Sequence, residues 1–136
     1  MIVLPKDATD EDIINVVRDF VNLLAKERYV EAFEMMYRNS KDEMSPELIK
    51  RLIEGYGFDE SVKDVFRVAS LEKMKNQEPE FQIDWLESVK GEKPRDIGTI
   101  HYDLPINGEW SDLTAIFDVY ELENGIALSL YDIHVL

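Results

Sequence analysis

Several residue types and patterns are absent from this 136-residue chain, and each absence excludes a class of protein or site. Because there is no cysteine, disulfides, thiolate catalysis and cysteine-based zinc sites are excluded. No apolar run approaches the ~18 residues of a membrane span, and the N-terminus lacks the cationic and apolar stretches of a signal peptide. We therefore expect a cytoplasmic protein without a membrane segment, although the lack of cysteine leaves the compartment open.

Basic residues are scarce as well. The chain has 15 Lys plus Arg against 29 Asp plus Glu, a net charge of −14, and residues 101–136 contain no Lys or Arg at all. Such a chain repels phosphate and anionic lipid, so we expect it to bind neither nucleic acid nor a membrane surface. Two explanations for the acidity stay open: surface carboxylates keep a small protein soluble, or an acidic face meets a basic partner.

Motifs that would identify an enzyme are also missing. The sequence contains no nucleophile signature, no metalloprotease motif and no phosphate-binding glycine loop, since Gly55-Tyr56-Gly57 lacks a further glycine and a preceding strand. We accordingly expect no cofactor. The length and the composition, 45% hydrophobic and 32% charged, are typical of one folded domain, which we assign to residues 1–136.

The first half of the chain carries helical patterns. Thr9 and Asp12 form a capping box ahead of apolar residues at helical spacing, and Ser45 before Pro46 is an N-cap followed by proline at the first helical position. The predicted helices span residues 10–26, 29–38 and 46–55.

The second half carries strand patterns. Asn107-Gly108 and Asn124-Gly125 separate alternating segments, which is the strongest short-range signal for β-hairpins. Residues 58–75 stay ambiguous, because 65–69 has strand composition whereas 58–66 could form a helical turn. The predicted strands span 81–89, 97–106, 110–123 and 126–136. Helices followed by an antiparallel meander indicate an α+β fold with the helices packed on one face of the sheet.

This order of elements resembles the NTF2-like (cystatin-like) superfamily. The resemblance implies N-terminal helices that cover the concave side of a curved antiparallel sheet and leave a cone-shaped cavity. The ending, Trp110-Ser-Asp-Leu-Thr-Ala-Ile-Phe through Tyr131-Asp-Ile-His-Val-Leu136, also resembles small uncharacterised bacterial domains. NTF2-like folds host isomerases, dehydratases, transport factors and toxin-neutralising immunity proteins, so the resemblance does not choose a function.

The first hairpin predicts an acidic, aromatic sheet face. A two-residue turn at Asn107-Gly108 pairs Tyr102 with Leu113 on an apolar face. It also pairs Asp103 with Asp112 on the opposite face, where like charges cost up to ~1 kcal/mol unless solvent, a cation or a basic partner compensates. The predicted partner-binding residues are Asp103, Trp110, Asp112, Asp118 and Tyr120.

The second hairpin leaves two registers open. A two-residue turn at Asn124-Gly125 places Asp132 beside Phe117 on the helix-covered face, with His134, so that both line the cavity. A three-residue loop over 123–125 moves every side chain to the other face. In that register the core would receive Tyr131, Ile133 and Val135, and the outer face would receive Asp132 and His134. Both faces of this segment are about equally apolar, so the sequence does not choose.

Two classes of function follow from these alternatives. The first is a non-catalytic module that binds a basic protein, possible examples being toxin-neutralising immunity proteins, through the acidic aromatic face. The second is an isomerase-like or dehydratase-like enzyme in which Asp132 is the base and His134 or Tyr102 the donor. A sheet-to-sheet homodimer through Ile116, Tyr120 and Leu122 is a further possibility. We predict no metal site, because His101, Asp103, Asp132 and His134 form only a weak ligand pattern.

Overall fold

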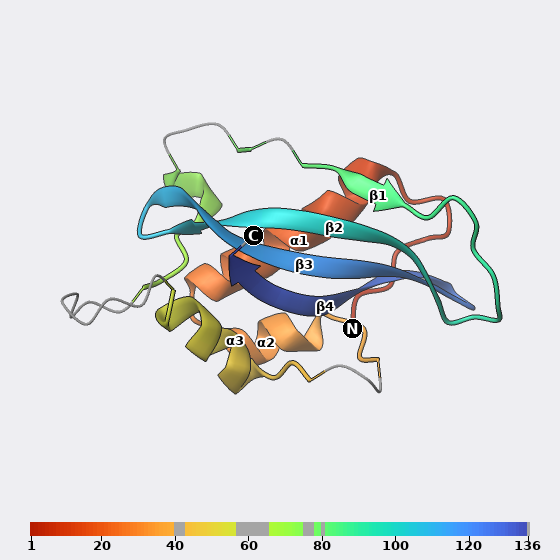
Figure 1. Cartoon of the computed structure of the whole chain (residues 1–136), viewed down its shortest axis with the longest axis horizontal. Coiled ribbons are helices and arrows are strands. Elements are labelled where there is room, and N and C mark those ends of the chain that lie inside the picture. The colour runs from red at the N-terminus through yellow and green to blue at the C-terminus, as the bar shows by residue number, and fades with distance from the viewer. Residues whose placement is uncertain (40–42, 57–65, 75–77, 80, 136) are drawn as a thin grey trace.

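The protein is an α+β structure in which the helices precede the sheet along the chain (Figure 1). The computed structural model describes residues 1–39, 43–56, 66–74, 78–79 and 81–135. The described elements are α1 (Asp10–Ala25), α2 (Tyr29–Glu34), α3 (Pro46–Glu54), the 3₁₀-helix η1 (Leu71–Lys73), β1 (Ile83–Trp85), β2 (Arg95–Ile106), β3 (Glu109–Leu122) and β4 (Gly125–Val135). The strands form one open antiparallel sheet in the order β1-β2-β3-β4. None of the described helices is long and apolar enough to cross a membrane.

The helices begin where the sequence predicts. The capping box of α1 is present, since the Asp12 amide donates to the Thr9 hydroxyl at 3.2 Å and the Thr9 amide donates to the Asp12 carboxylate at 3.0 Å. Ser45 caps α3 in the same way through the amide of Leu48. α2 ends at Glu34, earlier than the predicted residue 38, because the amide of Tyr37 donates to the Leu128 carbonyl of β4 at 2.7 Å.

The core lies between α1 and the sheet. In Figure 1, α1 crosses behind β2 and β3, while α2 and α3 lie beside β4. Phe20 of α1 meets Phe117 of β3 edge to face, with ring centroids 5.4 Å apart, and both side chains are fully buried. We call the sheet face toward α1 the inner face and the opposite one the outer face.

The predicted register of the first hairpin is wrong over most of its length. Near the turn the pairing is as predicted, with Pro105 opposite Trp110. A β-bulge follows, and beyond it Asp103 lies opposite Thr114 and not opposite Asp112. The Thr114 hydroxyl donates to the Asp103 carboxylate at 2.8 Å. The predicted carboxylate repulsion is therefore replaced by a hydrogen bond.

The second hairpin follows neither predicted register throughout. Leu122 pairs with Gly125, so the turn residues are 123 and 124, and both predicted turns are wrong. Between the turn and the bulge, Phe117 pairs with Leu130 and not with Asp132, so Leu130 lies on the inner face. The register then shifts by one residue, because Tyr131 is an extra residue on β4 and its side chain is 61% exposed.

Beyond this bulge, Asp132 and His134 lie on the outer face. They pair with Ile116 and Thr114, while Ile133 pairs with Ala115 and is fully buried. This is the placement of the second predicted register. Val135, which that register assigns to the core, is instead 51% exposed.

The sheet edges are partly covered by short segments. Leu4 bridges Ile126 on β4 with backbone hydrogen bonds of 2.7 and 2.8 Å. A Cβ at Gly125 would lie 2.1 Å from the Leu4 carbonyl oxygen, so this approach requires glycine. On the other edge, β1 is shorter than the predicted strand 81–89, and Val68 forms an isolated bridge to Ile106. Of the ambiguous segment 58–75, residues 58–65 and 75 fall outside the described residues, and the described residues 66–74 contain the Val68 bridge and η1 but no full strand or α-helix.

Candidate functional site

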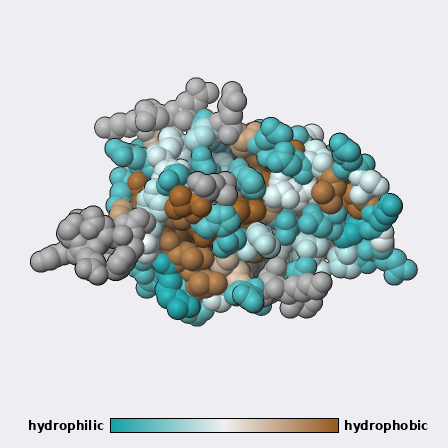
Figure 2. Space-filling view, viewed as in Figure 1, coloured by the Kyte–Doolittle hydropathy of each residue, from teal (hydrophilic) through white to brown (hydrophobic). Residues whose placement is uncertain are grey.

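The outer sheet face carries carboxylates and aromatic rings. By strand register, this face receives His101 and Asp103 from β2, Thr114, Ile116, Asp118 and Tyr120 from β3, and Asp132 and His134 from β4. Figure 2 shows that the surface over the sheet is mostly hydrophilic, with a hydrophobic area where the C-terminal end of β4 approaches α2 and α3. Most of the outer face is therefore polar, and apolar contact area is confined to the region near α2 and α3.

The carboxylates of this region are held by donors that carry no fixed charge. Asp103 accepts from the Thr114 hydroxyl, and Asp112, at the bulge of β3, accepts from the Tyr56 hydroxyl. Asp132 accepts from the Ile133 amide at 2.8 Å, and its other oxygen lies 2.6 Å from His134 Nδ1. A hydroxyl or amide orients a carboxylate without cancelling its charge, and His134 adds a positive charge only when it is protonated.

Two predicted partner-binding residues lie elsewhere than expected. Trp110 packs edge to face against the buried Tyr102 ring, with centroids 6.4 Å apart, and contacts the hydrophobic core. The ring of Trp110 therefore turns toward Tyr102 and away from the outer face. Tyr120 does lie on that face, but it is covered in part by the Tyr37 ring at 5.1 Å and by Asn39, whose amide donates to its hydroxyl at 2.6 Å.

The three predicted catalytic residues are not brought together. Tyr102 is 2% exposed and its partner Ala115 belongs to the inner face, whereas Asp132 and His134 lie on the outer face. Within the described part of the chain, no three His, Asp or Glu side chains are grouped closely enough to hold a metal ion. A shared Asp, His and Tyr pocket therefore does not form.

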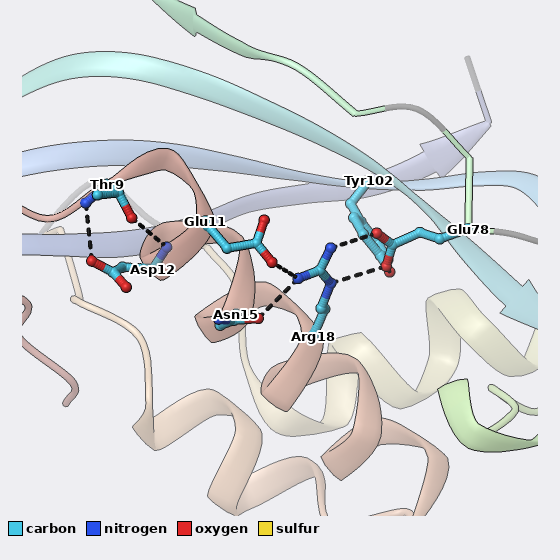
Figure 3. Close-up of polar contacts among 7 residues, drawn as sticks. All are labelled: Thr9, Glu11, Asp12, Asn15, Arg18, Glu78 and Tyr102. Atoms are coloured by element: carbon cyan, nitrogen blue, oxygen red, sulfur yellow. Dashed lines mark hydrogen bonds and ion pairs between the residues drawn. The ribbon is translucent and has the colours of Figure 1, made fainter.

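A network that the sequence did not predict lies between α1 and β2 (Figure 3). Arg18 donates to both oxygens of Glu78, from Nε at 3.1 Å and from Nη2 at 2.8 Å, and the Tyr102 hydroxyl donates to Glu78 at 2.6 Å. The remaining Nη1 of Arg18 donates to Glu11 at 2.7 Å and Asn15 at 2.9 Å. Glu78 thus connects its own segment to α1 through Arg18 and to β2 through Tyr102.

The network shifts the pKa values of its members. Hydrogen bonding to Glu78 raises the pKa of Arg18 above its usual range. Burial, reinforced by Glu78, raises the pKa of the Tyr102 hydroxyl. Burial alone would raise the pKa of Glu78, but the hydrogen bonds from Arg18 and Tyr102 and the charge of Arg18 outweigh it and lower that pKa. The network is therefore a charged carboxylate between a guanidinium and a protonated phenol.

A pocket of about 350 Å³ opens beside this network, at the edge of β2, and residues from both faces of the sheet line it. Its lining includes Phe81, Gln82, Asp84, His101, Tyr102 and Asp103. The Arg18 guanidinium lies 5.4 Å from the centroid of the Phe81 ring. The two carboxylates of the lining are not neighbours, because Asp84 lies opposite Thr99, four residues along β2 from Asp103.

No family model, curated protein or solved structure matches this chain. The functional interpretation consequently depends on the geometry of the chain's own residues. One weak signal for the network is present in the sequence, namely Arg18 beside the apolar stripe of α1 in a chain with few basic residues. The sequence contains none for Glu78, which lies outside every predicted element.

Proposed function

We propose that this chain is a non-catalytic protein-binding module of NTF2-like type that binds a basic partner through the outer sheet face. The observation that carries the proposal is that Asp103 and Asp132, both on the outer face, are oriented by hydroxyl, amide and imidazole groups. Within the described residues, the Lys and Arg ion pairs involve glutamates elsewhere in the structure. These aspartates therefore keep their charge for a partner.

A basic protein fits this face better than nucleic acid or a membrane surface does. The net charge of −14 repels nucleic acid and anionic membranes, and it attracts a cationic protein over several ångströms. Aspartates held in fixed positions lose little side-chain entropy on binding, which favours specific pairing with Lys and Arg. A toxin-neutralising immunity protein is one role that such a surface would serve.

The two competing roles have weaker support. The enzyme alternative needs Asp132, His134 and Tyr102 in one pocket, and they lie on opposite faces of the sheet. The homodimer needs an apolar outer face, yet Ile116 is 6% exposed and Leu122 is 8% exposed. An apolar sheet-to-sheet contact would gain little area from these side chains.

The proposal can be tested with a Lys/Arg-rich peptide titrated into the ¹⁵N-labelled protein. We expect the amide shifts to concentrate on the outer-face positions of β2 and β4. Replacing Asp103 and Asp132 together by Asn should weaken binding about five-fold, since two exposed charge contacts of about 0.5 kcal/mol each sum to about 1 kcal/mol.

Glu123→Gln is the control, because it removes one exposed carboxylate at the β3–β4 turn, away from the outer face. We expect this variant to bind the peptide as the unchanged protein does. Shifts concentrated on the acidic first turn of α1 would contradict the proposal, as would equal losses in the control and the double variant. Either result would mean that net charge alone attracts the peptide.

A further inference from the structure

Both histidines of the chain lie on the outer sheet face. His101 of β2 lies opposite Ile116, and Ile116 in turn lies opposite Asp132 of β4. Asp103 of β2 and His134 of β4 flank the next outer-face position of β3 in the same way. Each of these two rows therefore has a histidine at one end and an aspartate of the proposed interface at the other.

His134 contacts Asp132 directly. Its Nδ1 lies 2.6 Å from the Asp132 carboxylate, and the two side chains are 42% and 39% exposed, so water reaches both. Because a carboxylate accepts hydrogen bonds, Nδ1 carries the proton in this contact, and Nε2 of the neutral ring is the atom that takes up a further one. Protonation of Nε2 then places a full positive charge beside Asp132.

Among the described residues, Asp132 is the charged group in contact with His134. β3 presents Thr114 opposite His134, and Asp112, which is hydrogen-bonded to Tyr56, two residues before Thr114. α2 and α3 lie beside β4, and their charged residues are Glu31, Glu34, Glu47, Lys50, Arg51 and Glu54. In the part of the chain that the structure describes, none of these six forms an ion pair with His134.

His101 is exposed and has carboxylates before and after it along the outer face. Asp103 follows it by two residues on β2. Asp84 of β1 and Asp118 of β3 both lie opposite Thr99, two residues before it. Side chains two residues apart on a strand share a face, so a proton on His101 adds a positive charge between these carboxylates.

Histidine is the side chain that ordinarily changes charge between about pH 5 and 8, whereas aspartates stay ionised there. Protonation of the two histidines changes the net charge from −14 to −12, and both added charges fall on the outer face. We propose that the outer face is a pH-dependent interface, which binds the basic partner at neutral pH and releases it at about pH 5.5 as His101 and His134 are protonated. This inference rests on the proposed function and adds the regulation of that interface.

The test measures the affinity of a capped Lys/Arg-rich peptide without histidine for the ¹⁵N-labelled full chain at about pH 7.5 and about pH 5.5. The peptide keeps its charge over this range, so a change in affinity comes from the protein. Two protonated histidines cancel as much charge as the replacement of Asp103 and Asp132 by Asn removes, so we expect about five-fold weaker binding at the lower pH. His101→Gln combined with His134→Gln should bind equally at both pH values, while Glu123→Gln should keep the pH dependence of the unchanged protein.

A second measurement on the unchanged protein does not depend on how the variants fold. Imidazole ¹H–¹⁵N spectra should show the neutral His134 ring protonated at Nδ1, as its contact with Asp132 requires. A neutral ring protonated at Nε2 would overturn the inference, as would a pH-dependent loss of affinity that persists in the double histidine variant. If the peptide binds the outer face equally at both pH values, the pH dependence fails and the outer-face proposal stands. If the peptide does not shift the outer face at the higher pH, both proposals fail.

Discussion

Replacing Glu78 by glutamine removes the charge at the centre of the Arg18 network and keeps the shape of the side chain. Glu78 is 24% exposed and Arg18 is 26% exposed, so solvent screens this ion pair less than it screens a pair on the open surface. Three hydrogen bonds converge on the carboxylate, two from Arg18 and one from Tyr102. The substitution should therefore weaken the attachment of residue 78 to both α1 and β2.

The expected loss in the free energy of unfolding lies between two limits. Exposed ion pairs contribute up to about 1 kcal/mol, while hydrogen bonds to charged groups contribute about 1.5–3 kcal/mol each. Arg18 keeps Glu11 as a partner, and the carbonyl oxygen of the glutamine can still accept hydrogen bonds at the place of one carboxylate oxygen. We expect Glu78→Gln to lower the free energy of unfolding by about 1.5 kcal/mol, and the melting temperature by about 5 °C.

The effect should depend on pH in a defined direction. The pKa of Glu78 is lowered in the folded protein, because Arg18 and Tyr102 favour the charged form more than burial disfavours it. A lowered folded pKa contributes stability that is complete above the unfolded pKa, about 4.3 for glutamate, and is lost as pH falls through the folded pKa. The difference between the two proteins should thus be full at neutral pH and disappear in acid.

Urea unfolding at about pH 7, 5 and 3 measures this difference, with Glu123→Gln correcting for the general loss of one negative charge. Tyr102→Phe, alone and combined with Glu78→Gln, completes a double-mutant cycle in which the two losses should be less than additive. A stability difference that stays the same at pH 3 would refute the assigned role of the carboxylate. So would additive losses in the cycle.

Two further substitutions test the fold. Thr9→Ala removes the side-chain cap of α1 and should cost about 1 kcal/mol in urea unfolding, whereas an unchanged midpoint would show that the capping box contributes nothing. Phe117→Ala removes a fully buried ring that packs against Phe20 and should cost about 3–5 kcal/mol in calorimetry, so a loss below about 1 kcal/mol would contradict this placement of the core.

The sequence predicted those elements whose signals are local. The capping box, the helical stripe of α1 and the N-cap of α3 each lie within a few residues, and all three are confirmed. The Asn107-Gly108 turn is also confirmed, with positive φ at both residues. The end of α2 could not be predicted in this way, because it is decided by a hydrogen bond from Tyr37 to β4, far along the chain.

The site was predicted less well for the same reason. Asp103 and Asp118 lie on the outer face because alternation along a strand is local, whereas the Arg18 network joins side chains 60 residues apart. The predicted side of Trp110 is wrong, because its ring packs against Tyr102, a contact that alternation along β3 does not predict. Sequence reasoning thus located the acidic face but neither the network nor the pocket at its edge.

The bulge at Tyr131 explains why neither uniform register of the last strand is observed. A strand that keeps one register places either Leu130 or Ile133 on the inner face, because side chains alternate with a period of two. The first choice would also bury Asp132, and an unpaired buried carboxylate costs several kcal/mol. One extra residue lets both Leu130 and Ile133 enter the core, at 2% and 0% exposure, while Asp132 and His134 turn outward. The sequence is ambiguous because both assignments of side chains to faces occur, one on each side of Tyr131, although the pairing near the turn is neither of the two predicted ones.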